Sequence, residues 1–243
     1  MRNVLITGAS RGIGAETARL FALNGDNVII NYCRSQTDAE KLCNELQTSG
    51  LSAMTIKADV SAPAQVSEMF AQIEKTCGGA DVLVNNAGIA QTKLFTDITD
   101  NDWARMIKTN LSSVFYCCRA ALPYMIRKQN GRIINVASMW GQVGGSCEVH
   151  YSAAKAGVIG LTKALAKEEG LSGITVNCVS PGVIRTDMTS NLSDDDFRAL
   201  AEETPTGTIG TPADVARAIV YLASEGSGFI TGQVLSVSGG FVV

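Results

Sequence analysis

The residues with the clearest chemical potential are a tyrosine and a lysine four positions apart, Tyr151 and Lys155. The sequence after them, AGVIGLTKALAKEE, is typical of a helix, in which this spacing places both side chains on one face. A nearby ammonium group favours the phenolate and lowers the tyrosine pKa from its ordinary value of about 10. Such a tyrosine can pass a proton to or from a carbonyl oxygen or an alcohol. Ser138, thirteen residues earlier, could hydrogen-bond the same oxygen.

This pair alone is a weak indication, because about 0.3 Tyr-x-x-x-Lys pairs arise by chance in a chain with five tyrosines. It gains weight only if other elements bring a hydride to the same place. Those elements alternate between strand and helix patterns, which predicts a parallel sheet of seven strands with helices on both faces. The predicted strands are 4–6, 28–32, 53–56, 82–84, 133–136, 174–179 and 234–237, and the predicted helices are 13–23, 38–49, 64–76, 102–127, 150–169 and 212–223.

Composition excludes several classes of protein. The chain has 243 residues, 46% hydrophobic and 18% charged, with a net charge of −3, so nothing indicates nucleic-acid binding. No apolar run approaches the ~20 residues of a membrane span, and the first residues do not resemble a signal peptide. Seven cysteines without a C-x-x-C pair, together with a single histidine, argue against disulfides and metal sites. We expect one cytoplasmic domain over residues 1–243, no metal, and no catalytic role for His150.

The first strand leads into TGASRGIG, a turn that contains Gly8, Gly12 and Gly14. Glycines let the backbone approach a pyrophosphate, and the N-terminus of the next helix offers free N–H groups. The spacing differs from the usual G-x-G-x-x-G, and a glycine-rich turn can be no more than a tight turn. Its place at the first strand–helix junction favours a dinucleotide site.

The segment after the second strand bears on the choice of cofactor. An NAD site tends to place an acid there for the ribose 2′-hydroxyl, whereas this chain has none before Asp38. Arg34 stands in that place, and Arg11 lies in the glycine turn. Two guanidinium groups suit a 2′-phosphate, so we expect NADPH rather than NADH; the alternative is that both arginines are simply solvated. Asp59 could reach the edge of the adenine ring.

Two later segments also suit a cofactor site. Asn86, Ala87 and Gly88 follow the fourth strand, and such small residues let a flat ligand lie against the backbone. Asn110 lies inside the predicted helix 102–127, where an asparagine has a special role or faces water. Residues 189–210 lose strand character and contain the start of a short acidic helix at Ser193. Long segments of this kind in compact enzymes are often active-site lids, so we expect a substrate lid here.

Together these segments resemble the short-chain dehydrogenases/reductases over the whole chain. The matching segments, in the order of the family, are TGASRGIG at 7–14, NNAG at 85–88, Asn110, Ser138, YSAAK at 151–155, PGVIRTDM at 181–188 and TGQVLSVSGG at 231–240. The resemblance implies a Rossmann-like sheet, a nicotinamide cofactor and a homotetramer, in which the apolar helices 102–127 and 150–169 would suit the dimer faces.

The resemblance also implies a role for individual residues. Tyr151 would be the general acid in reduction, Lys155 would lower its pKa and bind the nicotinamide ribose, and Ser138 would polarise the substrate oxygen. Asn110 would hold a water in a proton relay, and Thr186 would meet the nicotinamide carboxamide. The implied cofactor contacts are Gly8, Ser10, Arg11, Gly12, Ile13, Gly14, Arg34, Ser35, Asp59, Val60, Asn86, Ala87, Gly88, Tyr151, Lys155, Pro181, Gly182, Val183, Ile184 and Thr186.

Within the family the chain looks most like the bacterial 3-oxoacyl-[acyl-carrier-protein] reductases, through NYCRS, LPYMIRKQNGRIINVAS and YSAAKAGVIGLTKALAKE. That group usually reads VDGG near its end, whereas residues 236–240 here are SVSGG. Trp140-Gly141 and GSCEV at 145–149 instead resemble the 5-aminopentanone reductases that complete a lysine-borne modification on bacterial elongation factor P. The substrate is therefore expected to be a small-molecule or carrier-bound ketone of either kind.

Glu148 is a further candidate substrate contact beside Ser138 and Tyr151. A carboxylate three residues before Tyr151 would suit a cationic aminoketone better than a neutral acyl chain, unless it is merely a solvated glutamate. Two other functions stay open. A related NAD-linked alcohol dehydrogenase is disfavoured by the missing acid, and a non-catalytic nucleotide sensor would be expected to have lost its catalytic residues.

Overall fold

In the computed structural model, which describes residues 1–190 and 192–242, the seven predicted strands pair into one parallel sheet. Their order is β3-β2-β1-β4-β5-β6-β7, so the predicted Rossmann-like fold is confirmed. The central strands are largely apolar and buried because helices cover both of their faces. The strands are β1 (Asn3–Ile6), β2 (Asn27–Tyr32), β3 (Ala53–Lys57), β4 (Val82–Asn85), β5 (Gly131–Val136), β6 (Ile174–Pro181) and β7 (Val234–Val237).

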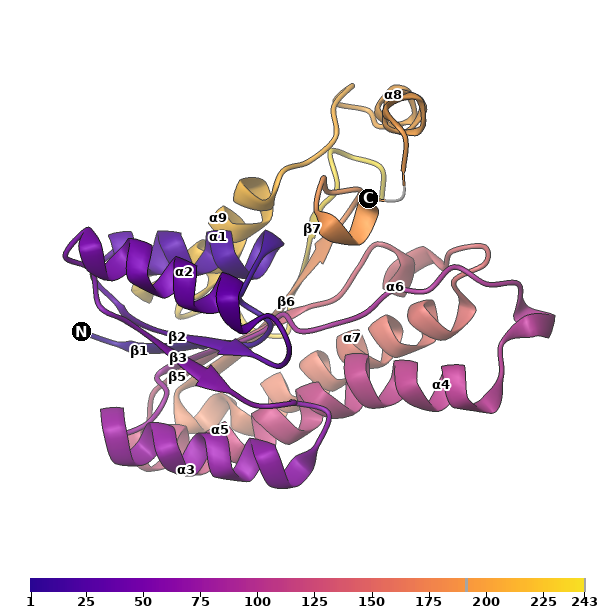
Figure 1. Ribbon diagram of the computed structural model, residues 1–243. Coiled ribbons are helices and arrows are strands. Elements are labelled where there is room, and N and C mark those ends of the chain that lie inside the picture. The colour runs from indigo at the N-terminus through magenta and orange to yellow at the C-terminus, as the bar shows by residue number, and fades with distance from the viewer. Residues whose placement is uncertain (191, 243) are drawn as a thin grey trace.

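Helices form a layer on each side of the sheet (Figure 1). Each layer has its own apolar core, with Phe21 and Ile219 in the first and Met125 and Val158 in the second. The first layer consists of α1 (Gly12–Leu23), α2 (Gln36–Thr48) and α9 (Pro212–Leu222). The second consists of α3 (Pro63–Cys77), α4 (Asp100–Ile107), α5 (Ser113–Lys128) and α7 (Val149–Glu169).

The order of the strands reverses at the centre of the sheet. The chain passes from β1 outward through β2 and β3 and then returns to pair β4 with the other side of β1. Leu5 of β1 thus pairs with Ile29 on one side and Leu83 on the other. Because the connections leaving β1 and β4 turn to opposite faces, a crevice opens outside their carboxyl ends.

The prediction of one continuous α-helix over 102–127 was wrong in one respect. A π-helical segment, Lys108–Ser112, separates α4 from α5. Two further short α-helices lie between these elements. They are α6 (Trp140–Val143), which was not predicted, and α8 (Asp194–Glu203), which begins after Ser193. No helix in the described residues is long and apolar enough to cross a membrane.

The base of the predicted lid is attached to the end of β6. Ile184 forms a bridge with Gly210, and the Arg185 N–H donates to the Gly210 carbonyl at 3.0 Å. The Arg185 guanidinium lies 3.9 Å from the centre of the Phe197 ring of α8. Residue 191, within the predicted segment 189–210, lies outside the described residues.

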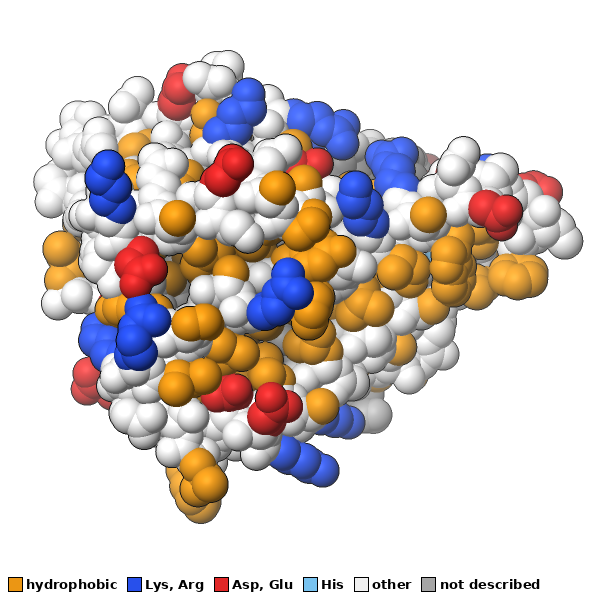
Figure 2. Space-filling model, turned by 90° about the horizontal axis from the view of Figure 1, so that it is seen from below, with side chains coloured by type: hydrophobic (Ala, Val, Ile, Leu, Met, Phe, Trp, Pro, Cys, Tyr) orange, Lys and Arg blue, Asp and Glu red, His pale blue; other side chains and the backbone are white. Residues whose placement is uncertain are grey.

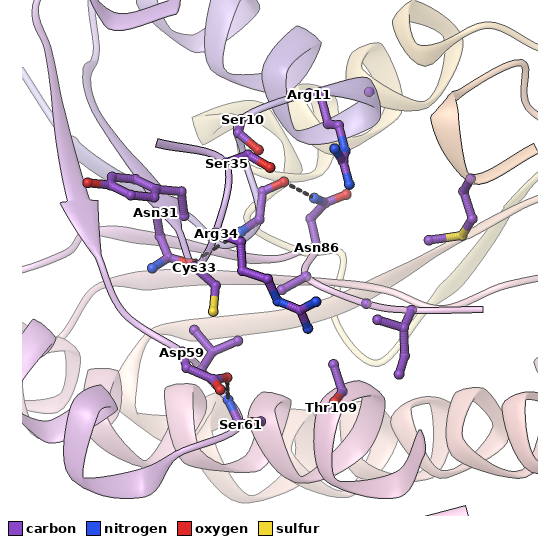
Figure 3. Close-up of a pocket in the computed structure, with 18 of the residues that line it drawn as sticks. Ser10, Arg11, Asn31, Cys33, Arg34, Ser35, Asp59, Ser61, Asn86 and Thr109 are labelled. Carbon is purple, nitrogen blue, oxygen red and sulfur yellow. Dashed lines mark hydrogen bonds between the residues drawn. The ribbon is translucent and has the colours of Figure 1, made fainter. Parts of the chain in front are cut away.

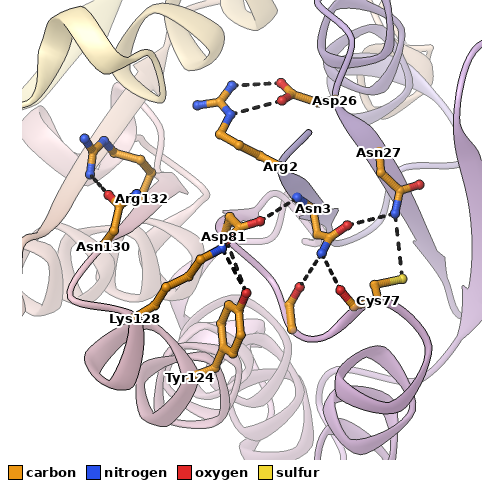
Figure 4. A network of polar contacts seen from close by, with 11 residues as sticks. Arg2, Asn3, Asp26, Asn27, Cys77, Asp81, Tyr124, Lys128, Asn130 and Arg132 are labelled. Carbon is orange, nitrogen blue, oxygen red and sulfur yellow. Dashed lines mark hydrogen bonds and ion pairs between the residues drawn. The ribbon is translucent and has the colours of Figure 1, made fainter.

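A polar network closes the opposite edge of the sheet, where the strands begin (Figure 4). The Asp81 carboxylate accepts hydrogen bonds from the Asn3 N–H at 2.8 Å and from the Tyr124 hydroxyl at 3.3 Å, and it forms an ion pair with Lys128. Arg2 donates twice to the buried Asp26 carboxylate. This edge is therefore filled by interactions that hold the fold together, whereas the carboxyl edge is left open.

Candidate active site

The glycine turn lies where β1 meets α1, and two of its glycines have a conformation that disfavours side chains. Gly8 and Gly12 have φ angles of 61° and 57°. A Cβ on Gly8 would lie 2.9 Å from the Ala87 Cα, and one on Gly14 would lie 2.7 Å from the Gly8 oxygen. These positions let the turn, the end of β4 and the start of α1 approach one another closely.

Three side chains fix this turn. The Asn31 Oδ1 accepts from the Gly8 N–H at 3.2 Å, and the Thr7 hydroxyl accepts from the N–H groups of Asn86 and Ala87. The Asn86 amide donates to the carbonyls of Thr7 and Gly8, each at 3.0 Å. Asn31 and Thr7 were not predicted as site residues. Their signal in the sequence is a polar residue at or just beyond the end of an otherwise apolar buried strand.

A cleft of about 790 Å³ opens above the turn, as Figure 3 shows. The predicted residues that line it are Gly8, Ser10, Arg11, Gly12, Ile13, Arg34, Ser35, Asp59, Val60, Asn86, Ala87, Gly88 and Thr186. The lining residues that sequence reasoning did not name are Asn31, Tyr32, Cys33, Ala58, Ser61, Ile89, Ala90, Arg105, Lys108, Thr109, Asp187 and Met188.

Seven other predicted cofactor contacts lie outside the lining of this cleft. Tyr151 and Lys155 belong to α7, Gly14 is packed beneath the turn, and the other four continue from the end of β6. A Cβ on Gly182 would lie 2.8 Å from the Ser238 Cα, so this glycine serves close packing against the end of β7. The others are Pro181, Val183 and Ile184, of which Pro181 and Ile184 are buried.

The charges in the cleft are predominantly positive. Arg34, Arg105 and Lys108 form no ion pair with a described residue, and Figure 3 shows the Arg34 side chain extending into the cleft. Arg11 instead lies 3.3 Å from the Asp187 carboxylate, and both side chains are largely exposed. An exposed pair of this kind is weak, so Arg11 remains available to an anion.

The N-terminus of α1 is open toward the cleft. Its first residue is preceded by Arg11, whose side chain makes no capping hydrogen bond. The first backbone N–H groups of the helix are therefore free to bind phosphate oxygens, which the dipole also favours. With the glycines below and the cations beside it, the cleft fits a dinucleotide.

A second group of side chains lies beside the cleft and consists of Ser138, Tyr151 and Lys155. Ser138 follows β5, and its hydroxyl accepts from the Trp140 N–H at 3.2 Å. Tyr151 and Lys155 lie in the first turns of α7, and the Lys155 Nζ lies 5.7 Å from the centre of the tyrosine ring. The lysine is held from behind, because its Nζ donates to the Val136 carbonyl at 2.7 Å.

Asn110 joins this group through the π-helical segment. Its Oδ1 accepts from the Ile89 N–H and its Nδ2 donates to the Ile89 carbonyl, both at 2.8 Å. A Cβ on Gly88 would lie 2.9 Å from the Asn110 Oδ1 and 3.6 Å from the Lys155 Nζ, so the three residues surround one point. The π turn, a feature frequent at functional sites, explains the asparagine in a helix interior.

Comparison with known proteins identifies the family. The family model described as Enoyl-(Acyl carrier protein) reductase matches residues 8–242. Two relatives are 3-oxoacyl-[acyl-carrier-protein] reductases FabG: that of Staphylococcus epidermidis is 42% identical over 239 residues (98% of each chain), and that of Escherichia coli K12 is 41% identical over 236 residues (97% of this chain and 95% of the relative). The chain belongs to the short-chain dehydrogenase/reductase family.

A solved structure of the same family agrees with this fold. It is a crystal structure from Agrobacterium tumefaciens, described as a candidate gluconate dehydrogenase, with a TM-score of 0.96 and 32% identity. The match covers 100% of this chain and 97% of the other. Membership of the short-chain dehydrogenases/reductases makes this protein an oxidoreductase of CH–OH groups and implies a nicotinamide cofactor, which the open helix end and the cleft accommodate.

The ionisation of this short-chain reductase site differs from the prediction. Burial raises the pKa of Tyr151 to about 12, while a hydrogen bond with Ser138 acts in the opposite direction. Burial also lowers the pKa of Lys155 to about 8. The expected lowering of the tyrosine pKa by Lys155 is not found among the described residues; the Ser138 hydrogen bond acts in that direction, and desolvation of the phenolate outweighs it. The phenol is consequently protonated at neutral pH.

Two residues before Tyr151, Trp140 and Glu148, also lie near its side chain. Trp140 packs in a cluster with Tyr151 and stacks edge-on against Phe241, with 6.2 Å between ring centres. Glu148 is half-buried, which raises its pKa, and its negative charge in turn raises that of Tyr151. Among the described residues no cation lies within ion-pair distance of Glu148. The described residues contain no cluster of three or more His, Cys, Asp or Glu side chains that could hold a metal ion.

Proposed function

We propose that this protein is an NADPH-dependent ketone reductase of the 3-oxoacyl-[acyl-carrier-protein] reductase type. The observation that carries the proposal is the convergence of Ser138, Tyr151 and Lys155 beside the dinucleotide cleft. The relatives named above act on 3-oxoacyl chains of a carrier protein, and their similarity extends over nearly the whole chain. This similarity supports the same class of substrate here.

Bound NADPH would supply a hydride to the carbonyl carbon. The Ser138 hydroxyl would donate a hydrogen bond to the carbonyl oxygen, and Tyr151 would transfer its proton to that oxygen, so that the ketone becomes an alcohol. The tyrosine pKa of about 12 keeps the phenol protonated, which is the form that reduction requires. The Lys155 ammonium, with a pKa near 8, is acidic enough to return a proton to the phenolate.

The preference for NADPH is supported by the charges of the cleft. Arg34 extends into it, no carboxylate takes the place of an acid after β2, and Arg105 and Lys108 line the same cavity. A 2′-phosphate would neutralise part of this positive charge, whereas a 2′-hydroxyl would not. NADH is therefore the poorer cofactor in this proposal.

Assembly into a homotetramer is part of the proposal. Trp103 of α4 and Phe115 and Ile126 of α5 are 44%, 45% and 38% exposed. Figure 2 shows apolar side chains gathered on this face of the molecule. A second copy would cover them, and a sedimentation experiment that finds a monomer at micromolar concentration would contradict this assembly. Free cysteines and a carrier-bound substrate are consistent with a cytoplasmic enzyme.

One assay tests the proposed substrate. NADPH oxidation is followed with a 3-oxoacyl thioester and, in parallel, with a ketone that carries a primary amine, such as a 5-aminopentanone-modified lysine. The proposal expects turnover of the thioester with the higher kcat/KM. Absence of NADPH oxidation with both ketones at millimolar concentration would overturn the reductase function.

A second candidate substrate is an aminoketone, and the observation that favours it is the environment of Glu148. A half-buried carboxylate without a cationic partner among the described residues is costly, and a substrate ammonium group would pair with it. Trp140, in the cluster around Tyr151, offers an aromatic surface that also attracts cations. In this case the substrate would be a modified lysine on a protein such as elongation factor P.

The two candidates respond differently to Glu148→Gln, which removes the charge and keeps the shape. If the substrate is an aminoketone, the variant should lose about tenfold or more in kcat/KM for it and little for the thioester, because only the ion pair is lost. An unchanged ratio of the two kcat/KM values would remove Glu148 from substrate selection.

A further inference from the structure

A polar bridge of four side chains joins the segment after β4 to the N-terminal ends of α4 and α7. Gln91 lies at its centre, with its Oε1 3.0 Å from the His150 Nε2 and its Nε2 donating to the Asp102 Oδ1 at 3.1 Å. The Lys93 Nζ donates to the other Asp102 oxygen at 2.7 Å. The first turn of α4 and the first turn of α7 are thus connected through one glutamine.

The donors and acceptors of this bridge fix its protonation. The Asp102 carboxylate only accepts, because its hydrogen bond with Lys93 holds its pKa well below the usual range. The Gln91 amide nitrogen therefore faces Asp102, its oxygen faces His150, and the histidine must donate through Nε2–H. His150 is fully buried and its Nδ1 has no partner among the described residues. A second proton there would be an unsatisfied buried donor, so His150 is neutral.

The same segment is held at three successive points. Ile89 is bound by Asn110 through both of its backbone groups, and Gln91 is bound as described. The Lys93 N–H donates to the Cys147 carbonyl at 2.7 Å. Residues 89–93, which we call the strap, therefore run from the cofactor cleft to the chain just before Tyr151.

The first turn of α7 lacks a capping side chain, so contacts from other segments are important for holding it in place. The first backbone N–H groups of a helix have no partner within it, and a capping side chain usually satisfies one of them. The residue before α7 is Glu148, and its side chain makes no capping hydrogen bond. His150 and Tyr151 are adjacent in this uncapped turn, so the bond from His150 to Gln91 holds the turn that carries Tyr151.

We infer that Gln91 and His150 are positioning residues, which act by holding Tyr151 at the proper place for proton transfer. The inference rests on the proposed role of Tyr151 as the proton donor. Neither side chain lines the cofactor cleft, although Ile89 and Ala90 of the strap do, so we expect the main effect on the proton step and only a small one on binding of NADPH. A displacement of about 1 Å can cost as much as 10²-fold in rate, and we expect a loss of about tenfold in kcat.

The test uses Gln91→Met and His150→Phe, which keep the size of each side chain and delete the hydrogen bond, together with the double variant. NADPH oxidation is measured with 3-oxobutanoyl thioester or with the aminoketone, whichever the native protein reduces faster. Gln72→Met is the matched control, because it makes the same chemical change at an exposed position on α3. The readouts are kcat, the KM for NADPH, the solvent deuterium isotope effect on kcat and the Tm.

We expect kcat to fall about tenfold in each single variant, with the KM for NADPH unchanged within about twofold. The double variant should lose no more than either single one, because both remove the same bond. The solvent isotope effect should rise, since a misplaced Tyr151 makes proton transfer slower. A purely structural role would lower the fraction of active enzyme and the Tm without changing the isotope effect, and that result would overturn the inference.

Tyr151→Phe separates this inference from the function on which it rests. If Tyr151→Phe is inactive while Gln91→Met matches the Gln72→Met control in kcat and isotope effect, positioning by the strap is wrong and the reductase mechanism stands. If Tyr151→Phe retains native turnover, the proposed mechanism fails and the inference fails with it.

Discussion

Asn110→Ala is the substitution whose consequence follows most directly from the structure. The asparagine is fully buried, and its side chain alone satisfies both the N–H and the carbonyl of Ile89, each at 2.8 Å. Leaving a buried polar group without its partner costs about 1–3 kcal/mol. Ile89 is only half-buried and lines the cleft, so water can replace part of each lost bond, and we expect a total cost of about 1–3 kcal/mol. For a chain of this size, each kcal/mol lowers the Tm by roughly 2–4 °C, and we expect a decrease of at least about 2 °C.

The activity should fall by more than the loss of stability explains. Ile89 and Gly88 line the cofactor cleft, and Gly88 lies against both Asn110 and Lys155. Release of the Ile89 backbone would therefore move the floor of the cleft near the lysine. We expect a loss of at least tenfold in kcat at a temperature where the variant is fully folded, since misplacements of about 1 Å have effects of this order.

The measurements are calorimetry for the Tm and NADPH oxidation with a ketone for kcat. Asn44→Ala is the control, because it makes the same change at an exposed position on α2, where substitutions usually alter stability by less than about 0.5 kcal/mol. If Asn110→Ala keeps the native Tm within about 1 °C and the native kcat within about twofold, the bonds to Ile89 do not have the importance assigned to them.

Three further substitutions test the site. Tyr151→Phe should lower kcat by at least about 10²–10⁴-fold with its Tm unchanged, because the proton donor is lost; native turnover would refute the mechanism. Arg34→Ala should raise the KM for NADPH far more than that for NADH, and equal changes would place this arginine outside the 2′-phosphate site. Lys155→Met tests the lysine pKa of about 8, which is below its unfolded value of about 10.5. Between these pH values the unfolded chain binds the extra proton, so the native protein should gain stability relative to the variant as the pH rises from 8 to 10.5, by an amount on the order of 3 kcal/mol. Denaturant titrations that show the same difference at pH 7.5 and pH 10 would contradict the lowered pKa.

Much of the site could be predicted from the sequence because its motifs depend on residues that are close together in the chain. The glycine turn at 7–14 has a conformation that only glycines adopt easily, and its place after a short apolar strand predicts a phosphate site. Tyr151 and Lys155 share a helix face through their spacing alone. Arg34 follows the second strand, and its position there was enough to predict that it lies in the cleft.

Contacts between distant segments could not be predicted in the same way. The interruption of the helix over 102–127 contains Asn110, whose side chain binds the backbone of Ile89, twenty-one residues earlier. The strap and its bond from Gln91 to His150 likewise depend on how two loops meet, and neither residue belongs to a pattern that sequence periodicity reveals.

The sequence by itself thus determined the fold, the cleft and the group of residues suited to hydride and proton transfer. Each depends on backbone conformation, strand alternation or helical spacing, and these act over a few residues. Only the tertiary structure decided the ionisation of the site. Burial, which no local pattern reports, holds Tyr151 protonated and makes Lys155 a weaker base. The tertiary structure also places Glu148 in a half-buried position near Tyr151, where the negative charge of Glu148 raises the pKa of the phenol.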